Sequence, residues 1–232
     1  MTSQPVTGQK PFVTLLVFSW NEIDGMREIM PKIPRDVVDR ILIVDGGSTD
    51  GTLEYAREQG YEIFVQQERG MGAAFLEAME RIGGDIVVVF SPDGNSVPER
   101  IPPLIAKIRE GYDMVIVSRY RDGAKSHDDD MVTAFGNWFF TTLINVLFSG
   151  KVTDGLVMYR AYTTSLIREA RVDTKANPWG SQILCRALRM GKRIGEIPGD
   201  EPARIGGERK MKVIQFGLAE LKAILREFLN RR

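Results

Sequence analysis

The chain has 232 residues, 43% of them hydrophobic and 27% charged, which is typical of a globular protein and long enough for one large α/β domain. Its 31 basic and 31 acidic residues cancel, which argues against a nucleic-acid partner, because such partners usually require a basic excess. The single Cys185 excludes an intramolecular disulfide, and the single His127 excludes a Cys/His zinc cluster.

The first half of the chain alternates apolar, β-rich runs with helical patterns. Strands are predicted at residues 11–20, 40–47, 61–66, 85–90 and 113–118, and helices at 24–33, 50–59, 71–82 and 97–110. Continuous Val, Ile and Leu runs separated by helices indicate a mostly parallel sheet with helices on both faces. The predicted class is therefore α/β and Rossmann-like. We find no repeat or linker, so a single domain over residues 1–232 is expected.

The second half is less regular. An apolar, aromatic helix is predicted at about 132–149, strands at 154–162 and 193–198, and helices at 179–190 and about 212–230. From residue 203 to the end there are eight basic residues and three acidic ones. The last helix is therefore basic within a neutral chain, and it could either contact an anionic partner or simply be solvated.

Polar clusters follow four of the predicted strands. They are Ser-Trp-Asn-Glu (19–22), Asp-Gly-Gly-Ser-Thr-Asp-Gly (45–51), Ser-Pro-Asp-Gly-Asn (91–95) and Ser-Arg-Tyr-Arg (118–121). Ligands of open parallel sheets bind beyond the carboxyl ends of the strands, so four such clusters favour a binding site over ordinary polar turns. Neither a G-x-G-x-x-G dinucleotide motif nor a P-loop is present. The glycine-rich helix start at 68–74 would suit a phosphate, or it is a plain helix entry.

These strings carry a resemblance to a known family. Phe-Ser-Trp-Asn-Glu (18–22), Val-Asp-Gly-Gly-Ser-Thr-Asp-Gly-Thr (44–52), Arg-Gly-Met-Gly-Ala-Ala (69–74) and Ser-Pro-Asp-Gly-Asn (91–95) resemble the family 2 glycosyltransferases of GT-A fold. The likeness is strongest to the dolichyl- and polyprenyl-phosphate sugar synthases. It continues through residues 118–121, 154–161 and 196–210, in the expected order.

The resemblance implies roles for individual residues. It implies nucleotide contacts for Phe18, Trp20, Glu22, Asp45, Gly70 and Asp93, and a Mg²⁺ or Mn²⁺ site at Asp93 and Asn95. It implies acceptor contacts for Arg119, Arg121 and Arg204, and catalytic roles for Asp93, Arg119, Arg204 and Lys210. Two departures stand out: Gly46 replaces the second acid of the family's V-D-D-G, and Ser91 replaces the first acid of D-x-D.

No carboxylate lies between Lys175 and Glu196, where many relatives have an acidic pair that serves as the general base. A phosphate monoester acceptor needs no such base, because its second pKa is about 6 and it is mostly an anion at neutral pH. We therefore expect inverting transfer from a nucleoside diphosphate sugar to a polyprenyl phosphate. The alternatives are transfer to a sugar hydroxyl in polysaccharide assembly, and a catalytically impaired nucleotide-sugar binding protein. Asp128–Asp130 either supplies a base or forms a solvated loop.

The predicted helix at 132–149 bears on the location of the protein. Residues 1–10 do not form a secretory signal, and no apolar stretch reaches the roughly 20 residues of a spanning helix, so we expect a cytoplasmic protein. A helix that is apolar nearly all round is buried in the core, covered by a second copy, or placed at a membrane surface. A peripheral position on the inner face of the cell membrane is thus one alternative, and a homo-oligomer is another.

Overall fold

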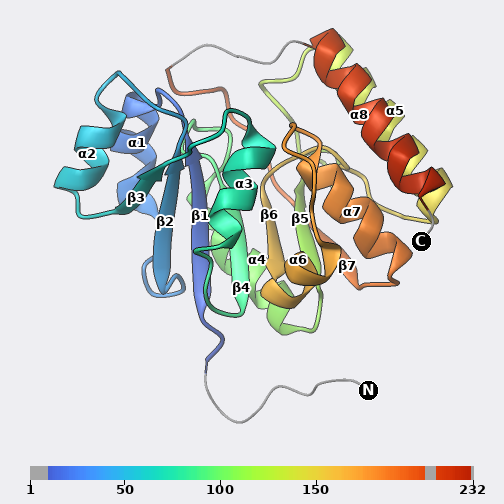
Figure 1. Cartoon of the computed structure of the whole chain (residues 1–232), viewed down its shortest axis with the longest axis horizontal. Coiled ribbons are helices and arrows are strands. Elements are labelled where there is room, and N and C mark those ends of the chain that lie inside the picture. Colours follow the sequence, from blue (N-terminus) through green and yellow to red (C-terminus); the bar gives the residue numbers. More distant parts are fainter. Residues whose placement is uncertain (1–9, 207–212, 231–232) are drawn as a thin grey trace.

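Seven strands form one mixed sheet in the computed structural model, which describes residues 10–206 and 213–230 (Figure 1). The strands are β1 (Val13–Ser19), β2 (Arg40–Asp45), β3 (Glu62–Val65), β4 (Ile86–Phe90), β5 (Met114–Ser118), β6 (Arg160–Thr163) and β7 (Ile194–Pro198), in the spatial order β3-β2-β1-β4-β6-β5-β7. Strand β6 is antiparallel to its neighbours β4 and β5, and the other pairs are parallel. The carboxyl ends of β1, β2, β4 and β5 therefore lie at one edge, where they bring the four polar clusters together.

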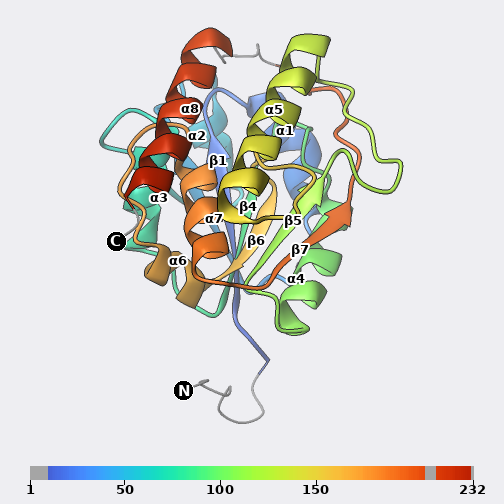
Figure 2. The same cartoon turned by 90° about the vertical axis from the view of Figure 1, so that its right-hand side faces the viewer.

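Helices cover both faces of the sheet (Figure 2). One face carries α1 (Ile23–Ile29), α2 (Thr52–Glu58) and α4 (Ile101–Arg109), and the other carries α3 (Met71–Met79), α6 (Thr164–Ala170) and α7 (Trp179–Arg189), with short 3-10 turns at Met30–Lys32 and Pro98–Arg100. Each face of the sheet has its own hydrophobic core, and alternate residues of β1 point into one or the other. Leu15 packs on the face covered by α1 and α4, and Leu16 packs on the face covered by α3 and α7. The predicted α/β class is confirmed.

Two further helices, α5 (Met131–Phe148) and α8 (Val213–Leu229), lie side by side over α7 (Figures 1 and 2). Helix α5 starts at a capping box, in which the Asp130 carboxylate accepts from the Thr133 N–H at 2.8 Å. Helix α8 is fixed to α7 through the buried Glu227, which accepts from Gln182 Nε2 at 2.7 Å and from Arg186 Nη2 at 2.7 Å. Both helices agree with the predicted ranges; residue 212 lies outside the described residues.

The strand predicted at 154–162 is wrong over most of its length. Only Arg160–Thr163 is a strand, because the Asp154 carboxylate accepts from the Val157 N–H at 3.2 Å and turns the chain there. Helix α6 directly after it was not predicted from the sequence. It begins where Thr163 Oγ1 accepts from the Leu166 N–H at 3.2 Å.

Glu220 of α8 is fully buried, and this makes the stability of the protein depend on pH. Burial raises the pKa of Glu220 to about 7, although the Ser181 hydroxyl and the Arg160 guanidinium act in the opposite direction. The pKa of a glutamate in the unfolded chain is about 4.3. Between these values the folded state holds the extra proton, so this group's contribution to stability is lost as the pH rises through about 7.

We expect Glu220→Gln, which cannot ionise, to raise the melting temperature at about pH 8 and to change it little at about pH 5. A glutamine removes the cost of ionising the buried carboxyl, roughly 4 kcal/mol at the higher pH. Thermal unfolding at both pH values checks this, with Glu54→Gln at an exposed position as the matched control. Equal effects of Glu220→Gln at the two pH values would contradict the assignment.

Candidate active site

Three predicted site residues meet at the carboxyl edge of the sheet. Glu22 lies just before α1, Asp93 lies in the turn after β4, and Arg204 lies in the segment that follows β7. Arg204 Nη1 donates to Glu22 Oε1 at 3.0 Å, and Arg204 Nη2 donates to Asp93 Oδ2 at 2.7 Å. Both carboxylates are buried, and the Arg204 side chain is 22% exposed. Residues far apart in the sequence therefore form one charged cluster, as the predicted topology requires.

Asp45 is fully buried and shapes the turn after β2. Its Oδ1 accepts from the N–H groups of Gly47 (2.8 Å) and Ser48 (2.7 Å), and its Oδ2 accepts from the Ser19 and Ser48 hydroxyls at 2.9 and 2.7 Å. Four hydrogen bonds use the accepting capacity of this carboxylate. A direct contact between Asp45 and a nucleotide therefore stays a prediction, and the geometry supports a loop-forming role.

Trp20 packs closely against one departure from the family pattern. A Cβ at position 46 would lie 3.0 Å from Trp20 Cβ and Cγ, so an aspartate there would require Trp20 to shift by a few tenths of an ångström. Trp20 is 49% exposed, which leaves part of its ring open at the same edge. An exposed aromatic ring can stack on a nucleobase.

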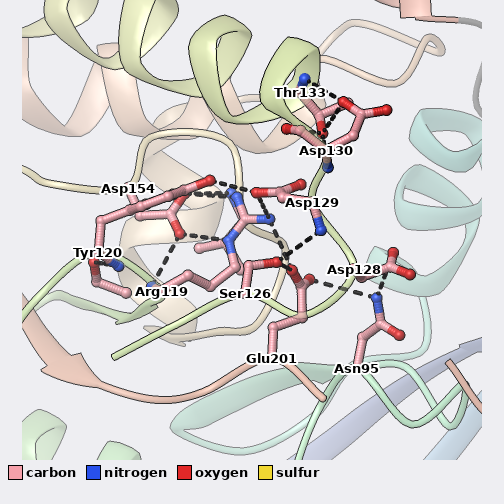
Figure 3. Close-up of polar contacts among 12 residues, drawn as sticks. Asn95, Arg119, Tyr120, Ser126, Asp128, Asp129, Asp130, Thr133, Asp154 and Glu201 are labelled. Carbon is pink, nitrogen blue, oxygen red and sulfur yellow. Dashed lines mark hydrogen bonds and ion pairs between the residues drawn. The ribbon is translucent and has the colours of Figure 1, made fainter. Parts of the chain in front are cut away.

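Asn95 connects the turn after β4 to an acidic loop (Figure 3). Its backbone N–H donates to Asp93 Oδ1 at 3.1 Å, and its Nδ2 donates to Asp128 Oδ2 at 3.0 Å and to Glu201 Oε1 at 3.5 Å. Its Oδ1 is buried and has no hydrogen-bond partner among the described residues. A buried oxygen of this kind beside a carboxylate suits a hard cation.

Arg119 lies at the centre of the acidic loop (Figure 3). Its Nε and Nη2 form a forked pair with Asp154 at 2.7 and 3.0 Å, and its Nη1 donates to Glu201 at 3.1 Å and Asp129 at 3.3 Å. Burial alone would lower the pKa of Arg119, but the three carboxylates raise it well above its ordinary value. Burial alone would raise the pKa of Asp154, but the charge and hydrogen bonds of Arg119 have the larger effect and bring that pKa below its ordinary value. Arg119 is therefore permanently charged and already paired.

Residues 128–130 do not form the solvated loop that was one of the two alternatives expected from the sequence. Asp128 accepts from Asn95, Asp129 accepts from Arg119 and the Tyr120 hydroxyl, and Asp130 caps α5. The Asp129 side chain is only 8% exposed. The D-x-x-T spacing of the capping box was the available signal for Asp130, whereas the partners of the other two depend on tertiary contacts.

The remaining predicted residues take other positions. Phe18 is buried in the core, with its ring 6.0 Å from that of Trp179. Gly70 has φ +115°, and a Cβ there would lie 2.8 Å from the Lys175 carbonyl, which also accepts from the Ala73 N–H at 3.2 Å. The start of α3 is thus covered by another loop. The side chain of Arg121 is 44% exposed and contacts Glu196 at 3.4 Å, and Lys210 lies outside the described residues.

Three acidic residues that the sequence did not single out organise the site. Asp154 and Glu201 hold Arg119, and Glu196 accepts from the N–H groups of Thr153 (2.8 Å) and Asp154 (3.2 Å). Glu196 thereby fixes the loop that presents Asp154. An acidic residue inside an apolar strand, as at position 196, is the one sequence signal that could have found this group, because a buried charge requires partners.

The site carries more negative than positive groups. The described carboxylates are Glu22, Asp93, Asp128, Asp129, Asp154 and Glu201, and the described guanidiniums among them are Arg119 and Arg204. No three of these acids, nor any other Asp, Glu, His or Cys of residues 10–206 and 213–230, converge as a complete metal site. Asp93 and Asn95 Oδ1 nevertheless fit Mg²⁺ or Mn²⁺, because Mg²⁺ commonly takes one or two carboxylates and completes its shell with substrate phosphates.

Comparison with known proteins identifies the family of the chain. The family described as glycosyl transferase family 2 matches residues 21–171. An undecaprenyl-phosphate mannosyltransferase of Micrococcus luteus is 29% identical over 214 residues, covering 86% of this chain and 87% of that protein. A dolichyl-phosphate hexose transferase of Haloferax volcanii is 28% identical over 222 residues, or 95% of both chains. A dolichol-phosphate mannosyltransferase of Pyrococcus furiosus is 29% identical, and the match covers 59% of its length.

A solved structure has the same fold. Glucosyl-3-phosphoglycerate synthase from Mycobacterium tuberculosis, in complex with Mn²⁺, uridine diphosphate and phosphoglyceric acid, matches with a TM-score of 0.72. The match covers 94% of this chain and 78% of that chain at 21% identity. At this identity the likeness establishes the fold, which is the GT-A fold expected from the sequence.

Proposed function

This chain belongs to glycosyl transferase family 2, and we propose that it is an inverting enzyme that moves a sugar from a nucleoside diphosphate sugar to a polyprenyl phosphate. The names of two relatives that match along most of their length, an undecaprenyl-phosphate mannosyltransferase and a dolichyl-phosphate hexose transferase, support the acceptor class. The donor is proposed to bind at the carboxyl edge, between Trp20 and the cluster of Glu22, Asp93 and Arg204.

Asp93 and Asn95 are the residues proposed to hold Mg²⁺ or Mn²⁺, which when bound neutralises the charge that develops on the leaving diphosphate. Asn95 is oriented for this task by Asp128, which accepts from its Nδ2 and so leaves its Oδ1 directed elsewhere. With Ser91 in place of an acid, the chain supplies one carboxylate from this turn. We therefore expect weak binding of the free metal and tighter binding together with a nucleoside diphosphate.

The observation that carries the acceptor assignment is the start of α7. The resemblance places an acidic pair in this stretch, but it contains no carboxylate, and its Trp179 is buried and stacks on Phe75 with the ring centroids 4.2 Å apart. The start of α7 therefore supplies no carboxylate base. A phosphate acceptor is already an anion and needs cations instead, for which Arg204, Arg121 and Lys210 are the candidates.

Transfer to a sugar hydroxyl is the second candidate, and Asp129 is the residue that favours it. This carboxylate lies beside Arg119 and Tyr120, close to the predicted acceptor arginines. Both neighbours donate to the same oxygen, Asp129 Oδ2, and so use the accepting capacity of that oxygen. The phosphate acceptor is therefore the stronger proposal.

A membrane-facing surface is proposed on α5 and α8. Of the sixteen large hydrophobic side chains exposed in the described residues, eleven lie on these two helices. They are Met131, Val132, Phe135, Trp138, Phe139 and Val146 on α5, and Val213, Ile214, Leu218, Leu225 and Leu229 on α8. By length and composition α5 could cross a bilayer, and 22% of it is buried. Because α5 packs beside α8 and against α7, we propose peripheral attachment from the cytoplasmic side, with the exposed Lys222 and Arg226 near anionic headgroups.

We expect label from a nucleotide sugar carrying mannose or glucose to move to polyprenyl phosphate when that lipid and free sugars are offered together. The rate should fall on the acid side with the acceptor's own pKa of about 6, since no protein base is required. Asp93→Asn should abolish transfer, whereas Asp129→Asn should cost less than the 100-fold or more expected for loss of a general base. Label that appears only on a sugar hydroxyl, together with a loss of at least about 100-fold in Asp129→Asn, would establish the second candidate.

We expect the protein to float with vesicles that contain anionic lipid and to lose this binding when both Phe135 and Trp138 are replaced by serine. Each exposed aromatic side chain contributes buried apolar area at the interface, so the double change should reduce the partition coefficient at least tenfold. Val65→Ser, at an exposed position on β3, is the matched control. Flotation equal to that of the parent would refute this surface, and a dimer lost in the double variant would assign it to a second copy.

A further inference from the structure

Arg204 supplies the positive charge between two buried carboxylates. Its guanidinium bridges the Glu22 and Asp93 carboxylates at 3.0 and 2.7 Å, and Asp93 is the acid proposed above to hold the metal. The side chains of these two acids are only 8% and 10% exposed. Two buried carboxylates this close together require a cation between them, because their charges are poorly screened.

The backbone on either side of Arg204 places the guanidinium there. The Ile205 N–H donates to the Asp93 carbonyl at 2.7 Å, and the Ile205 side chain packs over Gly94, where a Cβ would lie 2.7 Å from Ile205 Cγ1. One residue further, Gly206 has φ +66° and passes so close to Asp24 that a Cβ would lie 2.9 Å from Asp24 Oδ2. The contact of Arg204 with Asp93 is thus built by three successive residues of the segment.

A divalent cation on Asp93 would compete with Arg204. The guanidinium lies 2.7 Å from Asp93 Oδ2, so a metal bound to the same oxygen would lie within a few ångströms of a second positive charge and be repelled by it.

We propose that Arg204 is the resident counter-ion of the donor site in the free protein, and that it leaves Asp93 when the divalent cation and the nucleoside diphosphate bind. Once released, its fork of donors is available to the acceptor phosphate, for which a guanidinium is well suited. This inference rests on the proposed function and adds an order in which the substrates bind. The acceptor phosphate gains the cation that holds it only after the donor has bound.

The test is a titration of the protein with Mn²⁺ alone, followed by the electron paramagnetic resonance signal of the free ion. Arg204→Met removes the competing charge and should tighten Mn²⁺ binding at least about tenfold. Arg204→Lys keeps the charge and should stay within about threefold of the parent. Lys125→Met removes a charge from an exposed position in the 119–130 loop without contact to Asp93, and it controls for the general field of the protein.

Equal Mn²⁺ affinities for Arg204→Met and the parent would overturn the inference, as would equal gains in Arg204→Met and Lys125→Met. If Arg204→Met does not fold, as judged by its melting curve, Arg204→Gln provides the same comparison with a polar side chain. The proposed function is tested separately by transfer in the parent protein, so its failure cannot be mistaken for failure of this inference. If Arg204 acted only in catalysis, Arg204→Met would lower the rate of transfer and leave the Mn²⁺ affinity unchanged.

Discussion

A cluster of carboxylates at the carboxyl edge of the sheet is the constraint on which the rest of the site depends. Parallel strands bring their polar ends to one place, and the loops add Asp128, Asp129, Asp154 and Glu201 to the pair formed by Glu22 and Asp93. Each of these acids pairs with Arg119 or Arg204 or accepts from Asn95, because carboxylates held this far from water require such partners.

Arg119 and Arg204 pair with these carboxylates in different ways. Arg119 donates two hydrogen bonds to the Asp154 carboxylate, and Glu196 in turn holds the loop that carries Asp154. Arg119 is therefore a fixed part of the scaffold. Arg204 is the more exposed of the two, and its two partners are the residues implied for donor binding. A fixed charge can orient a loop, whereas an exchangeable charge can be transferred from one ligand to another. This difference supports a positioning role for Arg119 and the proposed contact of Arg204 with phosphate.

The sequence predicted most of the strands and helices and the edge where the polar clusters meet, because continuous apolar runs and strand-end motifs are local signals. It missed α6 and misplaced the start of β6. It also identified Glu22, Asp93, Asn95 and Arg204, which the structure brings into one region. What it could not supply are contacts between distant loops. The pairing of Arg119 with Asp154 and the burial of Trp179 against Phe75 follow from tertiary packing that leaves no pattern in the local sequence.

Two departures from the family pattern lie beside aromatic side chains. A Cβ at Gly46 would lie 3.0 Å from Trp20 Cβ and Cγ, and the start of α7, which has no carboxylate, contains the buried Trp179 stacked on Phe75. Neither position supplies a carboxylate to the site. The chain therefore depends more heavily on its remaining carboxylate in the turn after β4, Asp93, than a relative with the complete motifs would.

The central claim is that this edge is a donor site in which Arg204 and a divalent cation alternate on Asp93. The most direct measurement is anomalous diffraction from crystals grown with Mn²⁺ and a nucleoside diphosphate. The account predicts a manganese peak in contact with Asp93 and Asn95 Oδ1, with the Arg204 guanidinium moved away from Asp93. A manganese ion bound elsewhere, or Arg204 still bridging Glu22 and Asp93 while the nucleotide is present, would contradict it.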